Sequence, residues 1–399
     1  MAGNAFNLQD QNQWFKINYD KKSLNLLNNY NVIWGRVKRN FNFTGKQKFV
    51  STPLSFSGGS GAGVIPKANN AKYEGAIITA WRTYATCRLD REAIKASKNE
   101  GAFKEVTSEG VQKTVETYMR DQNRICFGDG SGILGNGMTG GQNVSGTGTE
   151  LDPYVVQVSA DWISAHFEEK DLLNLITGFS GTGRTAAGTV EAGTELEVIE
   201  VEEENRLVSL VGTSARLAAL TGVGPLLPTD AFVLQNSFKV EPIGLRGVRD
   251  YTGTLYGIAK QRRWQMKGID ADGQGISPSL INRLVLMVEK FQGHFGKIFM
   301  TSYEQFERIV EFLEDRKEYQ VSSKYAPMGK VNFSGVEILT TRGPIGIFVD
   351  RFCADDEAWL INEDHWMQHF RPGFGWFEED GTRFLRTPDN KDAYEAIYG

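Results

Sequence analysis

Residues 108–134 read SEGVQKTVETYMRDQNRICFGDGSGIL and contain a long helical pattern. Apolar residues recur there every three or four positions, and charged residues occupy the other faces, so the pattern predicts an amphipathic helix over 108–126. Ser108 is the expected N-cap, and the glycines at 128–132 are expected to end the helix. The residues expected to form the core-facing stripe are Val111, Val115, Tyr118 and Met119.

Two apolar runs precede this helix, at 46–56 and 73–89, and a polar segment rich in glycine separates them. The pattern predicts a long β-hairpin with a flexible tip. A two-stranded ribbon alone is marginal in water, so it needs a second surface to pack on. The residues expected to serve assembly through this hairpin are Phe49, Leu54, Phe56, Gly58, Gly59, Gly61 and Gly63.

The first 44 residues carry many aromatic side chains without a sustained helical or strand period. They predict an extended arm whose aromatic residues, Trp14, Phe15 and Trp34 among them, pack against a neighbouring subunit. The alternative is an irregular lid on the arm's own domain. The polar start shows no signal peptide, and no apolar run is long enough to span a membrane, so synthesis in a cytoplasm is expected.

Residues 135–237 are rich in Gly, Thr and Ser and predict a β-rich insertion, with strands at 154–158, 195–201, 207–211 and 232–234. Seven glutamates lie between Glu191 and Glu204 and alternate with apolar residues. This alternation is typical of a solvated strand face and not of a metal site.

The last third of the chain predicts a mixed α+β region. A helix is expected to open at Ser277 and Pro278, followed by a strand at 297–300 and a second helix at 303–316. Short strands are expected at 336–339, 345–349 and 358–361, and a short helix near Ala393.

Composition bounds the function. The chain has 399 residues, 40% hydrophobic and 23% charged, which suffices for one large domain or two to three smaller ones. Its net charge is −5, so the chain lacks the excess of basic residues that is typical of proteins that bind nucleic acid tightly. Cys87, Cys126 and Cys353 are odd in number and far apart, which predicts reduced thiols in the core instead of disulfides or zinc ligands.

Three motifs resemble catalytic or binding signatures, but their contexts disagree. Gly130–Gly135 fits G-x-G-x-x-G, yet a helix precedes it where a strand is required. The segment 178–185 resembles a phosphate-binding loop with Arg184 in place of lysine and no helix after it. His365 and His369 are four apart, but Trp366 stands where a zinc hydrolase needs glutamate. We therefore expect no enzyme: no catalytic residue, cofactor or metal.

The order of these elements resembles the major capsid proteins of tailed bacteriophages of the Hong Kong 97 type. The local similarity lies in Cys126-Phe-Gly-Asp-Gly-Ser-Gly-Ile-Leu134, in Lys297-Ile-Phe-Met-Thr-Ser-Tyr303 and in the stretch from Asp350 to Asn362. The resemblance implies an N-arm (1–44), an E-loop hairpin (45–89), a P-domain with a spine helix (90–134), the β-rich insertion (135–237), an A-domain (238–335) and a return to the P-domain (336–399).

The same resemblance implies a function as a structural head protein. Pentamers and hexamers of the chain would form an icosahedral virion shell around double-stranded DNA, assembled in the host bacterial cytoplasm. The implied partners are other copies of the chain, separate scaffolding, portal and decoration proteins, and DNA by non-specific proximity, with no membrane. An encapsulin-like compartment shell is the nearest alternative, and a nucleotide-dependent enzyme using the glycine loops is a more distant one.

The lysine-to-asparagine crosslink of some family members is not transferred to this chain. Lys46, Lys48, Lys67 and Lys72 lie on the hairpin, but no partner asparagine can be matched. A removable N-terminal scaffolding segment is not expected either, because the chain starts at the arm.

Overall fold

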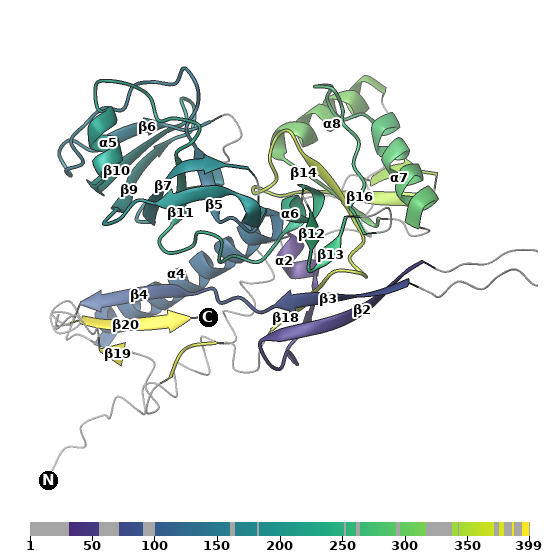
Figure 1. Ribbon diagram of the computed structural model, residues 1–399, viewed down its shortest axis with the longest axis horizontal. Helices are drawn as coiled ribbons and strands as arrows, with labels where there is room; N and C mark the ends of the chain where they lie inside the picture. Colours follow the sequence, from purple (N-terminus) through teal and green to yellow (C-terminus); the bar gives the residue numbers. More distant parts are fainter. Residues whose placement is uncertain are drawn as a thin grey trace, which may run out of the picture.

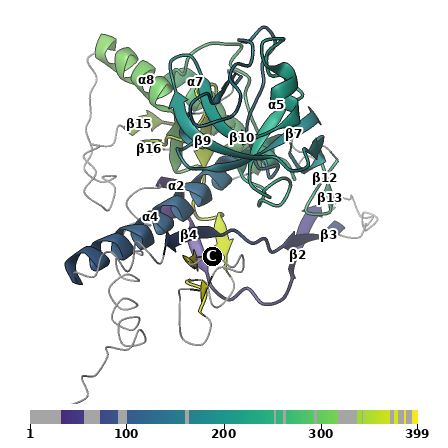
Figure 2. The same cartoon turned by 90° about the vertical axis from the view of Figure 1, so that its left-hand side faces the viewer.

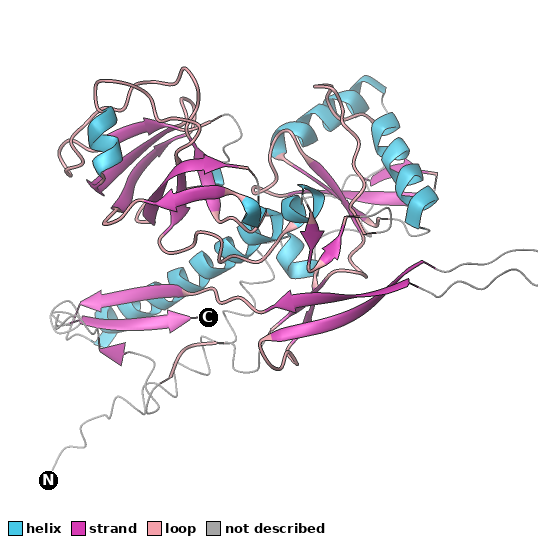
Figure 3. Ribbon diagram, viewed as in Figure 1, coloured by secondary structure: helices cyan, strands magenta, loops and turns pink. Residues whose placement is uncertain are grey.

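The computed structural model describes residues 32–55, 72–90, 100–159, 164–181, 183–250, 253–260, 264–292, 296–316, 337–341, 343–370, 375–378, 385–386 and 393–398. Helix α4 (Glu100–Phe127) runs beneath two bodies that lie side by side (Figure 1). One body is built mainly of strands and the other of strands covered by helices (Figure 3). The described chain is therefore a mixed α+β structure arranged around one long helix.

Helix α4 is longer than the sequence predicted. It begins at Glu100 and not after Ser108, so the prediction of Ser108 as the N-cap is wrong. The preceding residues include Ala102, Lys104 and Glu105, which are good helix formers. Because each residue added to an existing helix gains a hydrogen bond, these residues extend the helix through Ser108.

The first body contains a four-stranded sheet in the order β15 (Glu337–Thr340), β16 (Gly343–Val349), β14 (Ile298–Thr301) and β17 (Ala358–Ile361). Only β14 and β16 are parallel. Phe299 faces helices α7 (Pro278–Gln292) and α8 (Tyr303–Arg316), whereas its neighbours Ile298 and Met300 belong to the same core cluster as α4. The sheet is thus buried on both faces, which explains its continuous apolar strands.

The second body is a sheet of seven strands that curls until its ends meet. The order is β5 (Ile133–Asn136), β11 (Ala231–Leu234), β7 (Leu172–Ser180), β9 (Glu195–Glu202), β10 (Leu207–Thr213) and β6 (Tyr154–Gln157), and β8 (Ala187–Val190) pairs with β7. A 2.7 Å hydrogen bond from the amide of Ser159 to the carbonyl oxygen of Asn136 joins the end of β6 to β5. We call this body the barrel; the sequence missed its strands β5, β7 and β8.

The predicted hairpin is present, but its second strand is shorter than expected. β2 (Gln47–Ser55) pairs with β3 (Lys72–Thr79), and this pair is called the ribbon; it projects from the body beneath the small strands β12 and β13 (Figure 1). The rest of the predicted second strand forms β4 (Ala85–Asp90), which pairs with β20 (Ala393–Tyr398). The helix predicted near Ala393 is therefore wrong, because alternating Tyr394, Ala396 and Tyr398 favour a strand.

The end of the predicted arm is regular structure. Helix α2 (Val32–Arg36) and strand β1 (Lys38–Asn40) lie against the body, and β1 pairs with β18 (Met367–His369). Trp34 is 1% exposed and lies in the core cluster that includes α4. The prediction that Trp34 contacts a neighbouring subunit is therefore wrong, because its own subunit already covers the ring.

The remaining described elements are short. They are η1 (Ser164–His166), η2 (Gly183–Thr185), α5 (Ala215–Leu220), α6 (Leu245–Asp250), β12 (Thr254–Leu255), β13 (Ile258–Ala259) and β19 (Leu385–Arg386). Seen from the side, α4 extends past the barrel above it (Figure 2). No helix within the described ranges is long and apolar enough to cross a lipid bilayer.

The three cysteines are free thiols in different environments. Cys126 and Cys353 are buried, and burial raises the pKa of Cys126 to about 12. Cys87 on β4 is only half-buried, so its expected place in the core is wrong. It is the cross-strand partner of Ala396 in β20, in a strand whose neighbouring residues Thr86 and Arg88 are exposed.

Candidate functional site: the ribbon and its joint with the body

The ribbon has two faces because side chains alternate along each strand. Phe49 is paired directly with Ile77, and Tyr73 lies four residues before Ile77 on β3, so it is on the same face. We call these three residues the outer face. Their exposed fractions are 69% for Phe49, 58% for Tyr73 and 45% for Ile77. Within its own subunit the ribbon thus leaves a continuous apolar stripe uncovered.

A glycine shapes this outer face. A β-carbon added to Gly75 would lie 2.1 Å from Cε2 and Cζ of Phe49. An edge of the Phe49 ring, at Cε2 and Cζ, therefore lies over Gly75 of the neighbouring strand, where only glycine leaves room for it. Sequence reasoning identified Phe49 but missed Tyr73, Gly75 and Ile77, which become one surface only through the strand register.

The opposite face of the ribbon is anchored to the body. Ala76 is 2% exposed and clusters with Ile258, Tyr256 and Trp264. The amide of Ile77 donates a 2.9 Å hydrogen bond to the carbonyl oxygen of Tyr256. We call this contact between β3 and the β12–β13 turn the joint.

The turn at the joint has an unusual backbone. Tyr256 has φ of 53° and Gly257 has φ of 89°, so both central residues lie in the left-handed region, as a tight hairpin turn requires. A tyrosine adopts this conformation at a cost in strain energy. Burial of the Tyr256 ring and its hydrogen bond to β3 hold the residue there.

A second contact joins β2 to the body. Lys48 Nζ lies 3.2 Å from His369 Nε2, and His369 is in β18. Burial and the nearby Lys48 charge lower the pKa of His369. The sequence predicted that His365 and His369 are surface residues or have hydrogen-bond partners within the protein. His365 lies in a turn, where its amide donates to the Asn362 carbonyl oxygen, and His369 makes this contact with Lys48.

The other residues predicted to serve assembly give a mixed outcome. Leu54 lies on β2, but its side chain is outside the part of the chain that the structure describes. The remaining members lie outside the described residues: Trp14, Phe15, Phe56, Gly58, Gly59, Gly61 and Gly63.

The stripe predicted on α4 lies in the main core. Val115, Tyr118 and Met119 are 0%, 3% and 1% exposed. Val111 is within the helix, but its side chain is not among those described. The stripe packs on β14, β16 and β17 of the first body.

The polar side of α4 holds the barrel in place. Buried Arg120 pairs with Glu168 at 2.6 Å and with Asp171 at 3.0 Å, and both carboxylates belong to the barrel side. One turn later, Arg124 Nη1 donates to Glu241 Oε2 at 3.1 Å. Such pairs add little net stability, but breaking one would leave a buried charge, so they fix the orientation of the barrel.

The two glycine-rich motifs lie against each other, and Asp129 connects them. Its carboxylate accepts hydrogen bonds from the amide of Ser131 at 2.8 Å and from the amide of Gly183 at 2.9 Å. Gly132 approaches the carbonyl oxygen of Ser237, which a β-carbon would meet at 2.4 Å. Two of the loop amides, one from each motif, are therefore already engaged by a carboxylate of the protein. The first motif continues directly into strand β5, which begins at Ile133, where a dinucleotide site needs a helix.

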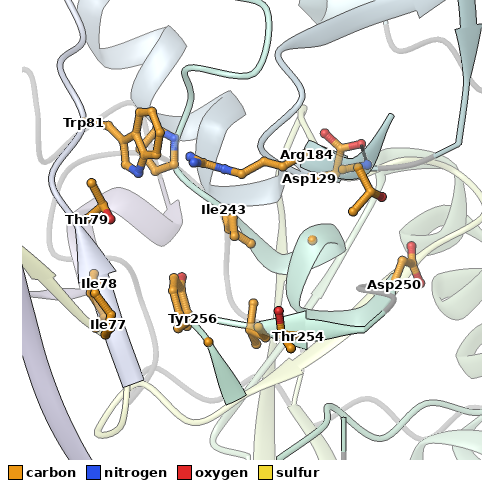
Figure 4. A pocket seen from close by; sticks show the side chains of 16 residues that line it. Ile77, Ile78, Thr79, Trp81, Asp129, Arg184, Ile243, Asp250, Thr254 and Tyr256 are labelled. Atoms are coloured by element: carbon orange, nitrogen blue, oxygen red, sulfur yellow. Dashed lines mark hydrogen bonds between the residues drawn. The ribbon is translucent and has the colours of Figure 1, made fainter. Parts of the chain in front are cut away.

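A cavity of about 360 Å³ lies between the ribbon, the glycine loops and the joint (Figure 4). Its apolar lining includes Ile78 of β3, Ile243 before α6, and Tyr256 at the turn. Arg184 crosses one end of the cavity with its guanidinium 3.6 Å from the ring centroid of Trp81. Within the described ranges, no group of three or more His, Cys, Asp or Glu side chains could hold a metal ion.

Comparison with known proteins gives little sequence similarity. No protein-family model matches the chain. No curated protein matches it either. Among solved structures, the chain is similar to a chain of the cyanophage A-1(L) capsid asymmetric unit, with 10% sequence identity and a TM-score of 0.43, over 91% of this chain and 85% of that one. Function is therefore inferred from the arrangement of the elements and from the surfaces of this chain.

Proposed function

We propose that the chain is the major capsid protein of a tailed bacteriophage. Its copies would assemble as pentamers and hexamers into an icosahedral shell that encloses double-stranded DNA. In this proposal it is a structural protein of the virion, assembled in the host cytoplasm, and it performs no catalysis. Separate scaffolding, portal and decoration proteins are its proposed partners.

The outer face of the ribbon is the observation that carries this proposal. Phe49, Tyr73 and Ile77 present large apolar surface on an element that projects from the body (Figure 1). A two-stranded ribbon gains stability when a further surface covers it. In a shell of identical subunits, a neighbouring copy supplies that surface at every position.

The joint gives the ribbon a defined direction while its outer face stays exposed to solvent. The hydrogen bond from Ile77 to Tyr256 and the burial of Ala76 fix the base of β3. An element fixed at one end and apolar on its free face favours head-to-tail contacts, which close into rings when the rotation allows. Many such contacts stabilise a shell even if each is weak.

The charge of the chain is compatible with a DNA container. A net charge of −5 gives no strong attraction to phosphates, so packed DNA would not be held tightly by the wall. Contact with DNA in this proposal is non-specific.

The first test is assembly of the purified protein with matched charge substitutions. Phe49→Asp places a charge on the outer face of the ribbon, whereas Leu151→Asp places one on a barrel loop where Leu151 is fully exposed. Phe49→Asp should abolish closed particles in electron micrographs and in sedimentation, and Leu151→Asp should leave them. Particles of normal size from Phe49→Asp would contradict the proposed role of the ribbon.

A shortened ribbon provides a second test. Ser51 and Gly75 are cross-strand partners, so residues 52–74 can be replaced by an Asn-Gly turn that preserves Ala76 and the joint. The variant should fold, as judged by an unchanged cooperative melting transition, and should not form shells. Loss of the melting transition would instead place the ribbon in the folding core of its own subunit.

The contents of the particles separate the phage shell from an encapsulin-like compartment. Particles from infected cells that contain double-stranded DNA support the proposal. A single enzyme trapped at high copy number, found by mass spectrometry of purified shells, would favour the compartment.

A further inference from the structure

Arg184 has an unusual electrostatic position. In the described part of the chain no carboxylate oxygen lies within 4.0 Å of it, although nearby arginines such as Arg249 are paired with acids. Its guanidinium carries five N–H donors, and the described residues accept one of them, through the carbonyl oxygen of Glu241. Burial lowers the pKa of Arg184, and the nearby Tyr256 opposes this shift.

The surroundings of Arg184 are mainly apolar. The cavity wall below it includes Ile78, Ile243 and Leu255, with the ring of Tyr256 on the same side (Figure 4). The guanidinium stacks on Trp81, an arrangement that fixes its plane, and its Nε is buried without a hydrogen-bond partner among the described residues. A cation at the rim of an apolar cavity is a combination that a ligand with one anionic end and an apolar body would match.

We propose that this cavity is a binding site for an apolar monocarboxylate, whose carboxylate pairs with the guanidinium of Arg184 and whose apolar body fills the space between β3 and the joint. Arginine suits this role because its planar fork matches a carboxylate with two parallel hydrogen bonds. The site spans the ribbon and the body, so an occupant would contact both.

The other charged residues of the cavity favour a ligand with one negative charge over a ligand with two. Asp129 and Asp250 also line it. Asp129 is satisfied by the amides of Ser131 and Gly183, and Asp250 pairs with Arg249, so neither is neutralised by Arg184. A phosphate with nearly two charges would be repelled by both carboxylates, whereas a carboxylate meets the same repulsion with one charge.

The carboxylate can come from a small molecule or from an acidic side chain of a second copy. Sedimentation velocity separates these sources. If a second copy supplies the carboxylate, saturating phenylacetate should dissociate the wild-type oligomers. The Arg184→Gln variant should then not associate at all. If a small molecule supplies it, phenylacetate should bind without changing the sedimentation coefficient.

Binding is measured with the full chain by titrating phenylacetate and following tryptophan fluorescence and calorimetric heat. The wild type should show saturable binding, and Arg184→Gln should weaken it at least about tenfold, since the variant loses the charge and the paired hydrogen bonds to the carboxylate. Arg184→Lys, which keeps the charge but loses the fork, should give an intermediate affinity. Arg283→Gln, at an exposed position on α7, is the matched control and should bind as the wild type does.

Ligand controls keep the test independent of protein stability. Phenylacetamide has the same shape without the charge and should bind at least about tenfold more weakly to the wild type than phenylacetate, and phenyl phosphate should also bind more weakly. Equal binding of phenylacetate to wild type and Arg184→Gln, equal binding of phenylacetamide, tighter binding of phenyl phosphate, or the absence of saturable binding would each overturn the proposal.

Discussion

The ribbon and the barrel are both built of β-strands, but they bury their apolar residues in opposite ways. Phe232 of the barrel is 0% exposed, and the barrel core around it includes Leu173, Leu175 and Val208, all fully buried. Phe49 of the ribbon is 69% exposed. A sheet that curls on itself covers its own inner face, whereas two strands have only solvent or another molecule to cover theirs.

This difference separates two uses of β-structure in one chain. The barrel has its own core and is linked to α4 through side chains such as Arg120 and Asp171. The ribbon has one anchored face and one open face. We therefore expect barrel residues to determine stability and outer-face residues to determine association, and the following predictions test that division.

The largest contrast should appear in isolated fragments. A fragment covering 131–238 contains the whole barrel core and should fold alone with a cooperative thermal transition. A peptide covering 45–80 contains the ribbon and should not fold, because nothing covers either face. Circular dichroism and amide proton dispersion measure both. A disordered barrel fragment, or a folded ribbon peptide, would remove the distinction.

The core around α4, which contains no residue of the ribbon or of the barrel strands, should be the most sensitive to single substitutions. Val115→Asp places a charge at a fully buried position of α4 and should lower the free energy of unfolding by about 4 kcal/mol or more. Lys113→Ala, two residues earlier on the exposed side, should change it by less than about 0.5 kcal/mol. Urea denaturation compares them, and equal stabilities would mean that the faces of α4 are assigned wrongly.

A matched pair of phenylalanine truncations compares the two regions directly. Phe232→Ala removes a fully buried ring and should lower the free energy of unfolding by about 3–4 kcal/mol. Phe49→Ala removes an exposed ring and should change subunit stability by less than about 0.5 kcal/mol while weakening assembly. Thermal melts of subunits and particle yields provide the two measurements. A large stability loss in Phe49→Ala would show that the outer face is covered within the subunit.

His166, which bonds to the Leu134 carbonyl oxygen of β5, should make the free energy of unfolding depend on pH. Burial lowers the pKa of His166 to about 3, and neighbouring Arg124, Arg246 and Arg120 add to this effect, although the Leu134 carbonyl opposes it. The unfolded chain binds the proton at its ordinary pKa near 6.5, so stability is complete above that pH and falls as the pH drops toward 3. The loss at pH 5 should be about 2 kcal/mol.

His166→Gln provides the control for this pH effect. Glutamine can still donate to the Leu134 carbonyl but does not titrate, so the free energy of unfolding of this variant should fall less between pH 6.5 and pH 5. Urea melts at both pH values measure it. An identical decrease in wild type and variant would assign the pH dependence to other groups.

Sequence periodicity was sufficient for long elements with one clear buried face. The stripe of Val115, Tyr118 and Met119, the helices near Pro278 and Tyr303, and the barrel strands at 195–202 and 207–213 follow from spacing alone. Each of these elements buries one side against its neighbours. Local pattern and tertiary packing therefore agree there.

Sequence reasoning failed where long-range pairing decided the structure. The strand Ala85–Asp90 looked like part of the hairpin because its true partner, Ala393–Tyr398, lies at the other end of the chain. Trp34 looked like a residue for intersubunit contact because the residues that cover it are distant in sequence. The cavity at Arg184 arises from the meeting of three segments, and no local pattern contains that information.

The smallest predicted effect concerns Gly75, the position that lets the Phe49 ring lie across the ribbon. In Gly75→Ala the new methyl group would overlap the far end of the Phe49 ring, 2.1 Å from its Cε2 and Cζ atoms. Because the ring is exposed, it can rotate away, so subunit stability should change by less than about 1 kcal/mol. Assembly should nevertheless slow, because the outer face loses this placement of the aromatic ring. Val50→Ala, on the opposite face of the ribbon and in strand β2, is the matched control and should leave the assembly rate unchanged, as followed by light scattering. If Gly75→Ala assembles as fast as Val50→Ala, the orientation of the ring contributes nothing, and exposure of the outer face alone would account for the contact.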